Sequence, residues 1–107
     1  MSTYAVAHLR DVIMGSDIIA YLERIDATLA PFGGRFLVHG GHVELLEGNL
    51  LGDLIIIAFP DREQARKWYT SPAYQAILPL RANNSAGDVI LIDTVADDHR
   101  ATDILAR

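Results

Sequence analysis

Apolar residues alternate with other residues in some stretches of this chain and recur at helical spacing in others. Residues 4–10 alternate, which predicts a first strand with one face made of Ala5, Ala7 and Leu9. A helix is predicted next, because four apolar residues fall on one stripe, namely Ile18, Leu22, Ile25 and Leu29. Ser16 or Asp17 is expected to cap its start, and Pro31 with Gly33-Gly34 to end it.

The next two extended segments are predicted to form a hairpin. Residues 35–47 have an extended pattern, and Gly40-Gly41 in the middle predicts a bulge or a sharp bend there. Turn residues occupy 47–53. Residues 54–59 then contain no polar side chain, which predicts a strand with two apolar faces.

A broken helix and a last strand complete the pattern. Asp61 followed by Gln64 resembles a capping box, and Ser71-Pro72 supplies an N-cap and a first-turn proline for a second short helix. Pro79 is expected to kink or end that helix. Its predicted apolar stripe consists of Ala73, Ala76, Ile77 and Leu80. Residues 89–95 are predicted to form the final strand.

The resulting order of elements, β-α-β-β-α-β, predicts a ferredoxin-like α+β sandwich with a four-stranded antiparallel sheet. The second helix is broken at Ser71-Pro72, and the first and third strands are central. The chain has 107 residues, of which 50% are hydrophobic, which suits one domain over residues 1–95. Residues 96–107 form a polar-rich C-terminal tail.

Two of the predicted strands are apolar on both faces, although helices cover only one side of such a sheet. Residues 54–59 and 89–92 carry apolar side chains in both directions. An uncovered patch of this size is unusual on a monomer, so we expect a second copy to pack sheet to sheet and form a homodimer. The alternative is that the tail folds back over this side.

Composition narrows the classes of function. The chain has no cysteine, which excludes disulfides, thiolate catalysis and cysteine-bound metal centres. The formal net charge is −5, and the one local basic cluster is Arg62, Arg66 and Lys67, so nucleic-acid binding is not expected. No apolar run is long enough to span a membrane and no signal peptide is evident, which predicts a soluble cytoplasmic protein.

A set of short motifs occurs in a specific order, and its most specific members are Trp68-Tyr69 and Ser71-Pro72-Ala73-Tyr74. The full set extends from residue 4 to about residue 95 and consists of residues 4–8, 29–38, 43–48, 59–60, 65–69, 71–75 and 80–81. Together these segments resemble a family of small bacterial proteins known only as domain of unknown function thirteen-thirty (DUF1330). That family lies within the dimeric α/β-barrel superfamily.

The resemblance implies a homodimer with a barrel-like core and a cleft between the sheet and the helices of each subunit. The superfamily includes cofactor-free monooxygenases, lactone isomerases and haem-dependent enzymes. In this chain Asn49-Leu50-Leu51-Gly52 stands where the family commonly has a tryptophan and a proline, which weakens inferences about the substrate at that loop.

Six residues are candidates for the cleft: His8 and Tyr74 as catalytic groups, and Arg35, Arg81, Tyr69 and Tyr21 as substrate-binding groups. In this hypothesis the arginines hold an anion, Tyr74 donates to an oxygen and His8 moves a proton. Packing explains the same residues in a different way: His8 as a hydrogen-bonded core histidine, Arg81 as a surface ion-pair partner and the tyrosines as core side chains. Trp68 is expected to anchor its helix to the sheet.

Metal and nucleotide sites have little support. His39 and His42 flank Gly40-Gly41, with Glu44 and Glu47 downstream, but the spacing matches no established ligand motif and no metal is predicted. The glycine pairs do not fit a phosphate-binding loop, and the serines lack a nucleophile motif.

The sequence therefore favours a small homodimeric protein that binds, and in one version transforms, a small anionic or carbonyl-bearing organic molecule without a tightly bound cofactor. The alternative is a non-catalytic ligand-binding or structural dimer module. Both remain open at this point.

Overall fold

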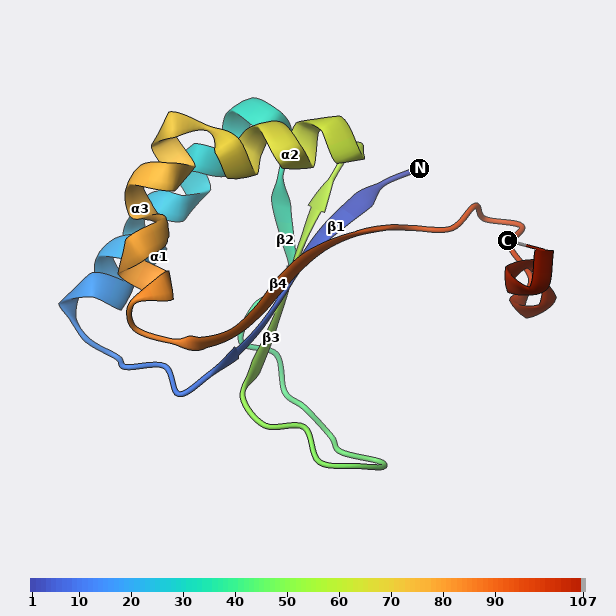
Figure 1. Cartoon of the computed structure of the whole chain (residues 1–107), viewed down its shortest axis with the longest axis horizontal. Coiled ribbons are helices and arrows are strands. Elements are labelled where there is room, and N and C mark those ends of the chain that lie inside the picture. The colour runs from blue at the N-terminus through green and yellow to red at the C-terminus, as the bar shows by residue number, and fades with distance from the viewer. Residues whose placement is uncertain (107) are drawn as a thin grey trace.

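Four antiparallel strands form one sheet in the computed structural model, which describes residues 1–106 (Figure 1). The elements in chain order are β1 (Thr3–Arg10), α1 (Ser16–Leu29), the 3-10 turn η1 (Ala30–Phe32), β2 (Arg35–Val38), β3 (Asp53–Phe59), α2 (Arg62–Thr70), α3 (Pro72–Ala82), β4 (Ala86–Asp93) and the 3-10 helix η2 (Ala101–Ala106). The strand order is β2-β3-β1-β4. The ferredoxin-like topology, with β1 and β3 in the centre, is confirmed.

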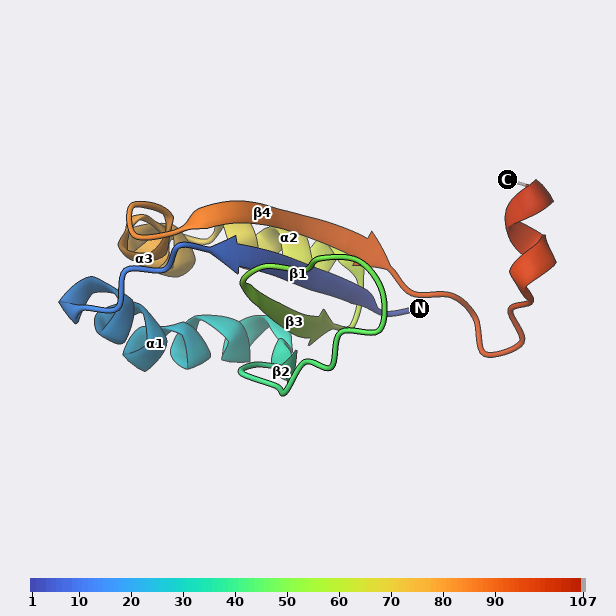
Figure 2. The ribbon, with the colours of Figure 1, turned by 90° about the horizontal axis from the view of Figure 1, so that it is seen from below.

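The sheet has two sides of different character. Ala5 of β1 lies opposite Ile57 of β3 and Leu91 of β4, on the side that the helices cover. Residues one position away point to the other side, since side chains alternate along a strand. Figure 2 shows the strands from this uncovered side, with α2 behind them. We call it the open side, and its main residues are Tyr4, His8, Arg35, Leu54, Ile56, Ala58, Ile90 and Ile92.

Strand β2 is much shorter than the pattern predicts. The prediction of a strand that reaches Glu47 with a bulge at Gly40-Gly41 is wrong, because the strand ends at Val38 and its register shift falls between Phe36 and Val38. Gly40 has a φ of 72°, a left-handed conformation that directs the chain away from the sheet. Residues 39–52 form a long loop instead.

Helix α1 begins without the predicted side-chain cap. Gly15 occupies the N-cap position, so neither Ser16 nor Asp17 caps the helix through its side chain. Its buried face is also turned slightly from the predicted stripe, because Tyr21 is buried whereas Leu22 is exposed. The helix continues into η1 before Gly33, which has a φ of 70° and caps the turn.

Helices α2 and α3 start as the sequence predicts. The Asp61 carboxylate accepts a hydrogen bond of 2.8 Å from the backbone N–H of Gln64, and the Ser71 hydroxyl accepts one of 3.2 Å from the backbone N–H of Tyr74. Pro79 does not end α3, which continues to Ala82. Pro79 is exposed, so its ring causes no conflict with the core. The buried face of α3 carries Tyr74 and Ile77 rather than the predicted alanines.

Trp68 anchors α2 to the core, as predicted. It is 2% exposed, and its Nε1–H donates a hydrogen bond of 3.0 Å to the Thr28 hydroxyl on α1. Its ring centroid lies 5.3 Å from that of Phe59 on β3. One side chain therefore links two helices and the sheet.

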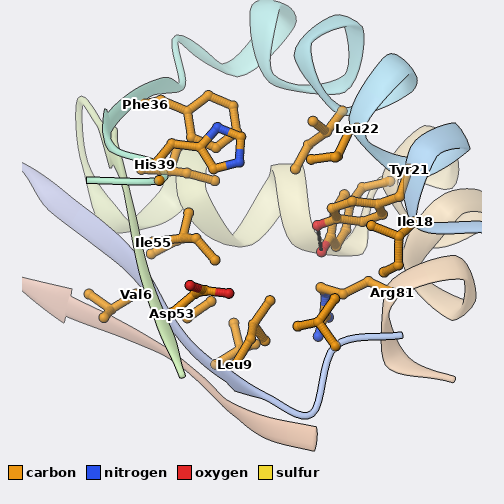
Figure 3. A pocket seen from close by; sticks show the side chains of 18 of the residues that line it. Val6, Leu9, Ile18, Tyr21, Leu22, Phe36, His39, Asp53, Ile55 and Arg81 are labelled. Carbon is orange, nitrogen blue, oxygen red and sulfur yellow. Dashed lines mark hydrogen bonds between the residues drawn. The ribbon is translucent and has the colours of Figure 1, made fainter. Parts of the chain in front are cut away.

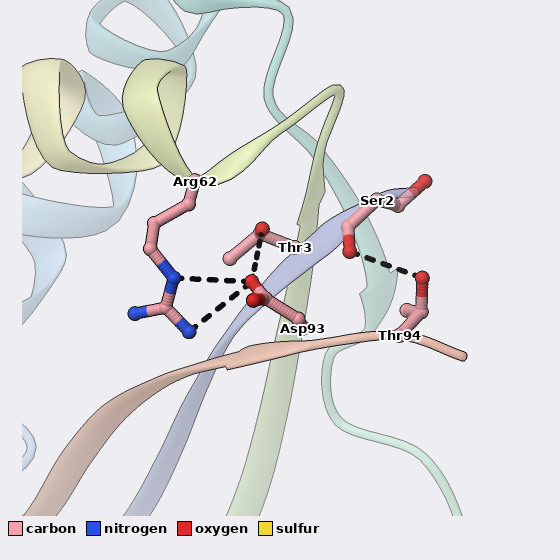
Figure 4. A network of polar contacts seen from close by, with 5 residues as sticks. All are labelled: Ser2, Thr3, Arg62, Asp93 and Thr94. Atoms are coloured by element: carbon pink, nitrogen blue, oxygen red, sulfur yellow. Dashed lines mark hydrogen bonds and ion pairs between the residues drawn. The ribbon is translucent and has the colours of Figure 1, made fainter. Parts of the chain in front are cut away.

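The end of β4 is tied to β1 and α2 by a small polar network (Figure 4). The Asp93 carboxylate accepts a hydrogen bond of 2.8 Å from the Thr3 hydroxyl, and the guanidinium of Arg62 lies 3.1 Å from the same oxygen. Beyond this point the tail extends away from the sheet in both overall views, so it does not cover the open side (Figures 1 and 2). No helix within residues 1–106 is long and apolar enough to cross a membrane.

Candidate functional site

A pocket of about 260 Å³ lies between the sheet and the helices α1 and α3 (Figure 3). This volume is close to the lower end of the range of about 300–1,000 Å³ that is usual for ligand pockets. Most of the wall is apolar and includes Leu9, Ile18, Ile25, Phe36, Ile55 and Ile57. The pocket is suited to a small organic molecule that is largely apolar.

Two hydrogen-bonded tyrosines from different helices line this pocket. The hydroxyl oxygens of Tyr21 on α1 and Tyr74 on α3 are 2.8 Å apart. Tyr21 is 8% exposed and Tyr74 is 2% exposed. Their rings meet edge to face, with centroids 6.2 Å apart. This pair is a fixed polar point in a mostly apolar wall.

Arg81 of α3 adds a positive charge beside the tyrosines. Its Cζ atom lies 6.0 Å from the centroid of the Tyr21 ring. Burial lowers the pKa of Arg81, but the neighbouring Tyr74 and Tyr21 phenols outweigh it, and the net shift is upward. Burial, followed by the contact with Tyr74, raises the pKa of Tyr21, and Arg81 offsets this only in part. At neutral pH the site therefore holds a neutral Tyr21 and a guanidinium cation.

Two further polar residues, His39 and Asp53, line the pocket, and sequence reasoning did not place them there. The ring of His39 stacks on that of Phe36, with centroids 4.5 Å apart and planes inclined by 13°. Asp53 begins β3 and lies opposite Leu9, on the helix-facing side. The sequence offered one indication of this placement, namely that His39 and Asp53 lie at the two ends of the segment that joins the strands β2 and β3. Within residues 1–106 no three histidine, aspartate or glutamate side chains gather closely enough to hold a metal ion.

Three of the six predicted site residues meet in this pocket, namely Tyr21, Tyr74 and Arg81. Tyr69 lies close by, with its ring centroid 5.6 Å from that of Tyr74. However, it lines a separate hollow between α2 and β4, together with Arg66 and Leu91. Tyr69 is therefore a neighbour of the pocket rather than part of its wall.

The prediction that His8 and Arg35 share one cleft with Tyr74 and Arg81 is wrong. His8 lies opposite Leu54, and Arg35 lies opposite Ala58, so both belong to the open side of the sheet. The His8 Nε2 atom forms a hydrogen bond with the backbone carbonyl of Leu51. Strand alternation determines this separation. Neighbouring residues of a strand point to opposite sides of the sheet, so His8 and Arg35 point away from the side on which the helices and the pocket lie.

Similar folds occur among solved structures, all at low sequence identity. RPA0582 of Rhodopseudomonas palustris, a protein of unknown function, aligns with a TM-score of 0.66 and 14% identity over 89% of this chain and 83% of that chain. SnoaB of Streptomyces nogalater, a cofactor-independent oxygenase, aligns with a TM-score of 0.61 and 15% identity over 92% and 98%. A dimeric ferredoxin-like protein of unknown function from Thermobifida fusca aligns with a TM-score of 0.56 and 18% identity over 86% and 88%.

These structures share the fold of this chain. At 14–18% identity they do not show its activity. No functionally curated protein matches the sequence. A family model does match, over residues 2–95, and its description is Domain of unknown function (DUF1330). The match spans both Trp68 of the core and all five polar residues of the pocket wall. The chain therefore belongs to the DUF1330 family.

Proposed function

We propose that the pocket binds a small organic molecule with a carboxylate or carbonyl oxygen. The observation that carries this proposal is the half-buried guanidinium of Arg81 beside the hydrogen-bonded Tyr21 and Tyr74 in an apolar pocket. A guanidinium matches a carboxylate in charge and geometry, and a phenol donates to a carbonyl or enolate oxygen. The apolar wall suits the rest of such a ligand.

Binding energy in this arrangement comes from two parts of the wall. The ligand oxygen replaces water at Arg81, where low polarity strengthens a charge-assisted hydrogen bond. Its carbon skeleton contacts residues such as Ile18, Phe36 and Ile57. The tyrosine pair then fixes the orientation of the oxygen, since both rings are held by the core.

We also propose that two copies associate through the open side. Ile90 and Ile92 are 51% and 49% exposed there, although they lie on the sheet beside the central strand. The Thermobifida fusca relative in fold is described as dimeric, as is one from Jannaschia sp. CCS1. A sheet-to-sheet dimer covers these side chains and leaves the pocket on the opposite side of each sheet.

Whether the bound molecule is transformed is a separate question. In support of catalysis, the same fold in SnoaB belongs to a cofactor-independent oxygenase. The alternative, a non-catalytic ligand-binding or structural dimer module, is favoured by the Tyr21–Tyr74 hydrogen bond, which gives each hydroxyl oxygen a partner without any ligand.

Calorimetric titration with phenylpyruvate, benzoate and hexanoate, and with neutral benzyl alcohol and 1-hexanol, tests the binding proposal. We expect the acids to bind better than the alcohols, and Arg81→Gln to weaken acid binding about tenfold to a hundredfold, as loss of a charged hydrogen bond implies. Arg24→Gln, on the exposed face of α1, is the matched control and should bind as the parent does. Equal affinity for acids and alcohols, or equal losses in both variants, contradicts the proposal. A loss of thermal stability in Arg81→Gln without binding of any probe by the parent favours the structural module.

A further inference from the structure

We propose that His39 is the proton acceptor of this pocket, and that it interconverts the keto and enol forms of a small 2-oxo acid bound at Arg81. This inference rests on the proposed binding function. It assigns to His39 the proton transfer that sequence reasoning assigned to His8. The argument depends on where the four histidines of the chain lie.

The other three histidines are placed elsewhere. His8 lies on the open side and bonds to the Leu51 carbonyl. His99 lies in the tail, where its Nδ1 is 3.6 Å from the Asp103 carboxylate. His42 lies in the long loop and does not line the pocket. His39 is therefore the histidine of the pocket wall.

His39 is an exposed residue whose ring stacks on that of Phe36, so its nitrogen atoms remain available. The stack on Phe36 holds the ring plane, and Phe36 itself packs against the core. Within residues 1–106, neither ring nitrogen of His39 has a hydrogen-bond or ion-pair partner; the histidines that do are His8 and His99. Figure 3 shows His39 across the pocket from Tyr21 and Arg81. A ring that is oriented by one stacking contact and is otherwise unpaired is suited to exchanging a proton with a ligand.

The two ends of the pocket are complementary to one class of molecule. Arg81 attracts a carboxylate, and within the Tyr21–Tyr74 pair one hydroxyl donates to the other, so that the accepting hydroxyl is free to donate to an adjacent ketone oxygen. An acidic C–H bond next to the ketone then points toward the opposite wall. Imidazole is the side chain that most readily exchanges protons near neutral pH. A pocket of about 260 Å³ accommodates a compound with one aromatic ring or a short alkyl chain.

The proton transfer is balanced without a cofactor. A ring nitrogen of His39 takes a proton from the carbon beside the ketone, and the C–H electron pair forms a carbon–carbon double bond. The carbonyl π electrons move to the oxygen, where Arg81 and the phenol that is free to donate stabilise the negative charge. The imidazolium returns its proton to that oxygen through water, which gives the enol. Reversal restores the ketone, and nothing is oxidised or reduced.

Other charged or titratable side chains share the pocket wall with His39. The charged or titratable groups that share the pocket wall are Asp53, Tyr21, Tyr74 and Arg81. Of these, Asp53 is the competing proton acceptor. The experiment therefore includes variants of both residues.

The test follows deuterium incorporation at C3 of phenylpyruvate by proton NMR in deuterium oxide, with binding measured in parallel by calorimetry. We expect the parent to exceed buffer, and His39→Gln to lose about a hundredfold or more of the exchange rate while affinity changes less than about threefold. His42→Gln, a histidine outside the pocket, should behave as the parent.

The possible results separate this inference from the function on which it rests. Three results overturn the assignment of His39 and leave the binding function standing. They are binding without exchange above buffer, unchanged exchange in His39→Gln, and loss of exchange in Asp53→Asn but not in His39→Gln. Absence of binding by the folded parent overturns both. Circular dichroism of each variant shows that a lost rate does not come from a lost fold.

Discussion

The two sides of this sheet consist of alternate residues of the same strands, yet they differ in how far their side chains are buried. On the helix-facing side, Ala5 and Ile57 are buried, and beyond them lies a pocket with a tyrosine pair and an arginine. On the open side, Ile90 and Ile92 are about half exposed, and no helix within residues 1–106 covers them. This difference is why we propose a small molecule as the ligand of the helix-facing side and a second copy as the partner of the open side.

The largest expected effect comes from removing the anchor of the helix-facing side. Trp68→Ala should lower the free energy of unfolding by about 3–5 kcal/mol, because it leaves a large cavity and removes the bond to Thr28. Urea denaturation measures the change. Lys67→Ala, the exposed neighbour on α2, is the control and should change stability by less than about 0.5 kcal/mol. A similar small change in Trp68→Ala would mean that the helices do not depend on this anchor.

On the open side, negative charges introduced at Ile90 and Ile92 should dissociate the proposed dimer. The double variant Ile90→Asp/Ile92→Asp should scatter light as a monomer of 11.8 kDa at micromolar concentration, whereas the parent should give about twice this mass. The reason is that two carboxylates in an apolar interface lose their hydration without a partner.

Ile19→Asp is the control for this experiment. Ile19 is as exposed as Ile90, at 51%, but it lies on α1, on the other side of the sheet. This variant should remain a dimer. A monomeric parent, or equal dissociation of both variants, would rule out the open side as the interface.

A smaller effect on stability is expected at the turn between η1 and β2. A Cβ atom at Gly34 would lie 2.7 Å from the Phe59 ring and 2.9 Å from the Leu29 side chain. Gly34→Ala should therefore cost about 1–3 kcal/mol of folding free energy by overpacking. Gly41→Ala, where the nearest side-chain atom is 3.8 Å away, should cost much less in the same urea titration. Equal costs at both positions would contradict the close packing at Gly34.

The smallest effect concerns Asp93, and it depends on pH. The hydrogen bond from Thr3 lowers the pKa of this carboxyl, and Arg62 adds to the shift. A lowered folded-state pKa stabilises the protein above the unfolded-state value of about 4, and the gain disappears as the pH falls through the folded-state value. Asp93→Asn should therefore have a lower urea midpoint than the parent at pH 7 and the same midpoint in strong acid.

The control for Asp93 is Asp98→Asn in the tail, which should match the parent at every pH. If the difference between Asp93→Asn and the parent were constant from pH 7 into strong acid, the ionised carboxylate would not be its source.

Local interactions made much of this structure predictable from the sequence. Asp61 and Ser71 cap α2 and α3 because a cap involves only residues three positions apart. Tyr74 and Arg81 share a helix face because they are seven residues apart, which is close to two turns. The topology followed from the order of the elements and the apolar character of residues 54–59.

Long-range contacts set what could not be predicted. Alternation on β1 shows that His8 and Ala5 face opposite sides, but only the packed helices decide which side holds the pocket. The end of β2 at Val38 depends on its pairing with β3 and on the conformation of Gly40. His39 lines the pocket because the long loop begins at this residue. Its spacing from the other polar residues in the sequence does not indicate this position.

The most direct test of the central claim is an NMR titration that maps where a ligand binds. Phenylpyruvate added to isotope-labelled protein should shift the backbone amide signals of the pocket wall, such as those of Tyr21, Tyr74 and Ile57, in a saturable manner. Leu54 and Ile92 of the open side should change little. Saturable shifts confined to the open side, or no shifts at millimolar ligand, would contradict the assignment of the helix-facing pocket as the binding site.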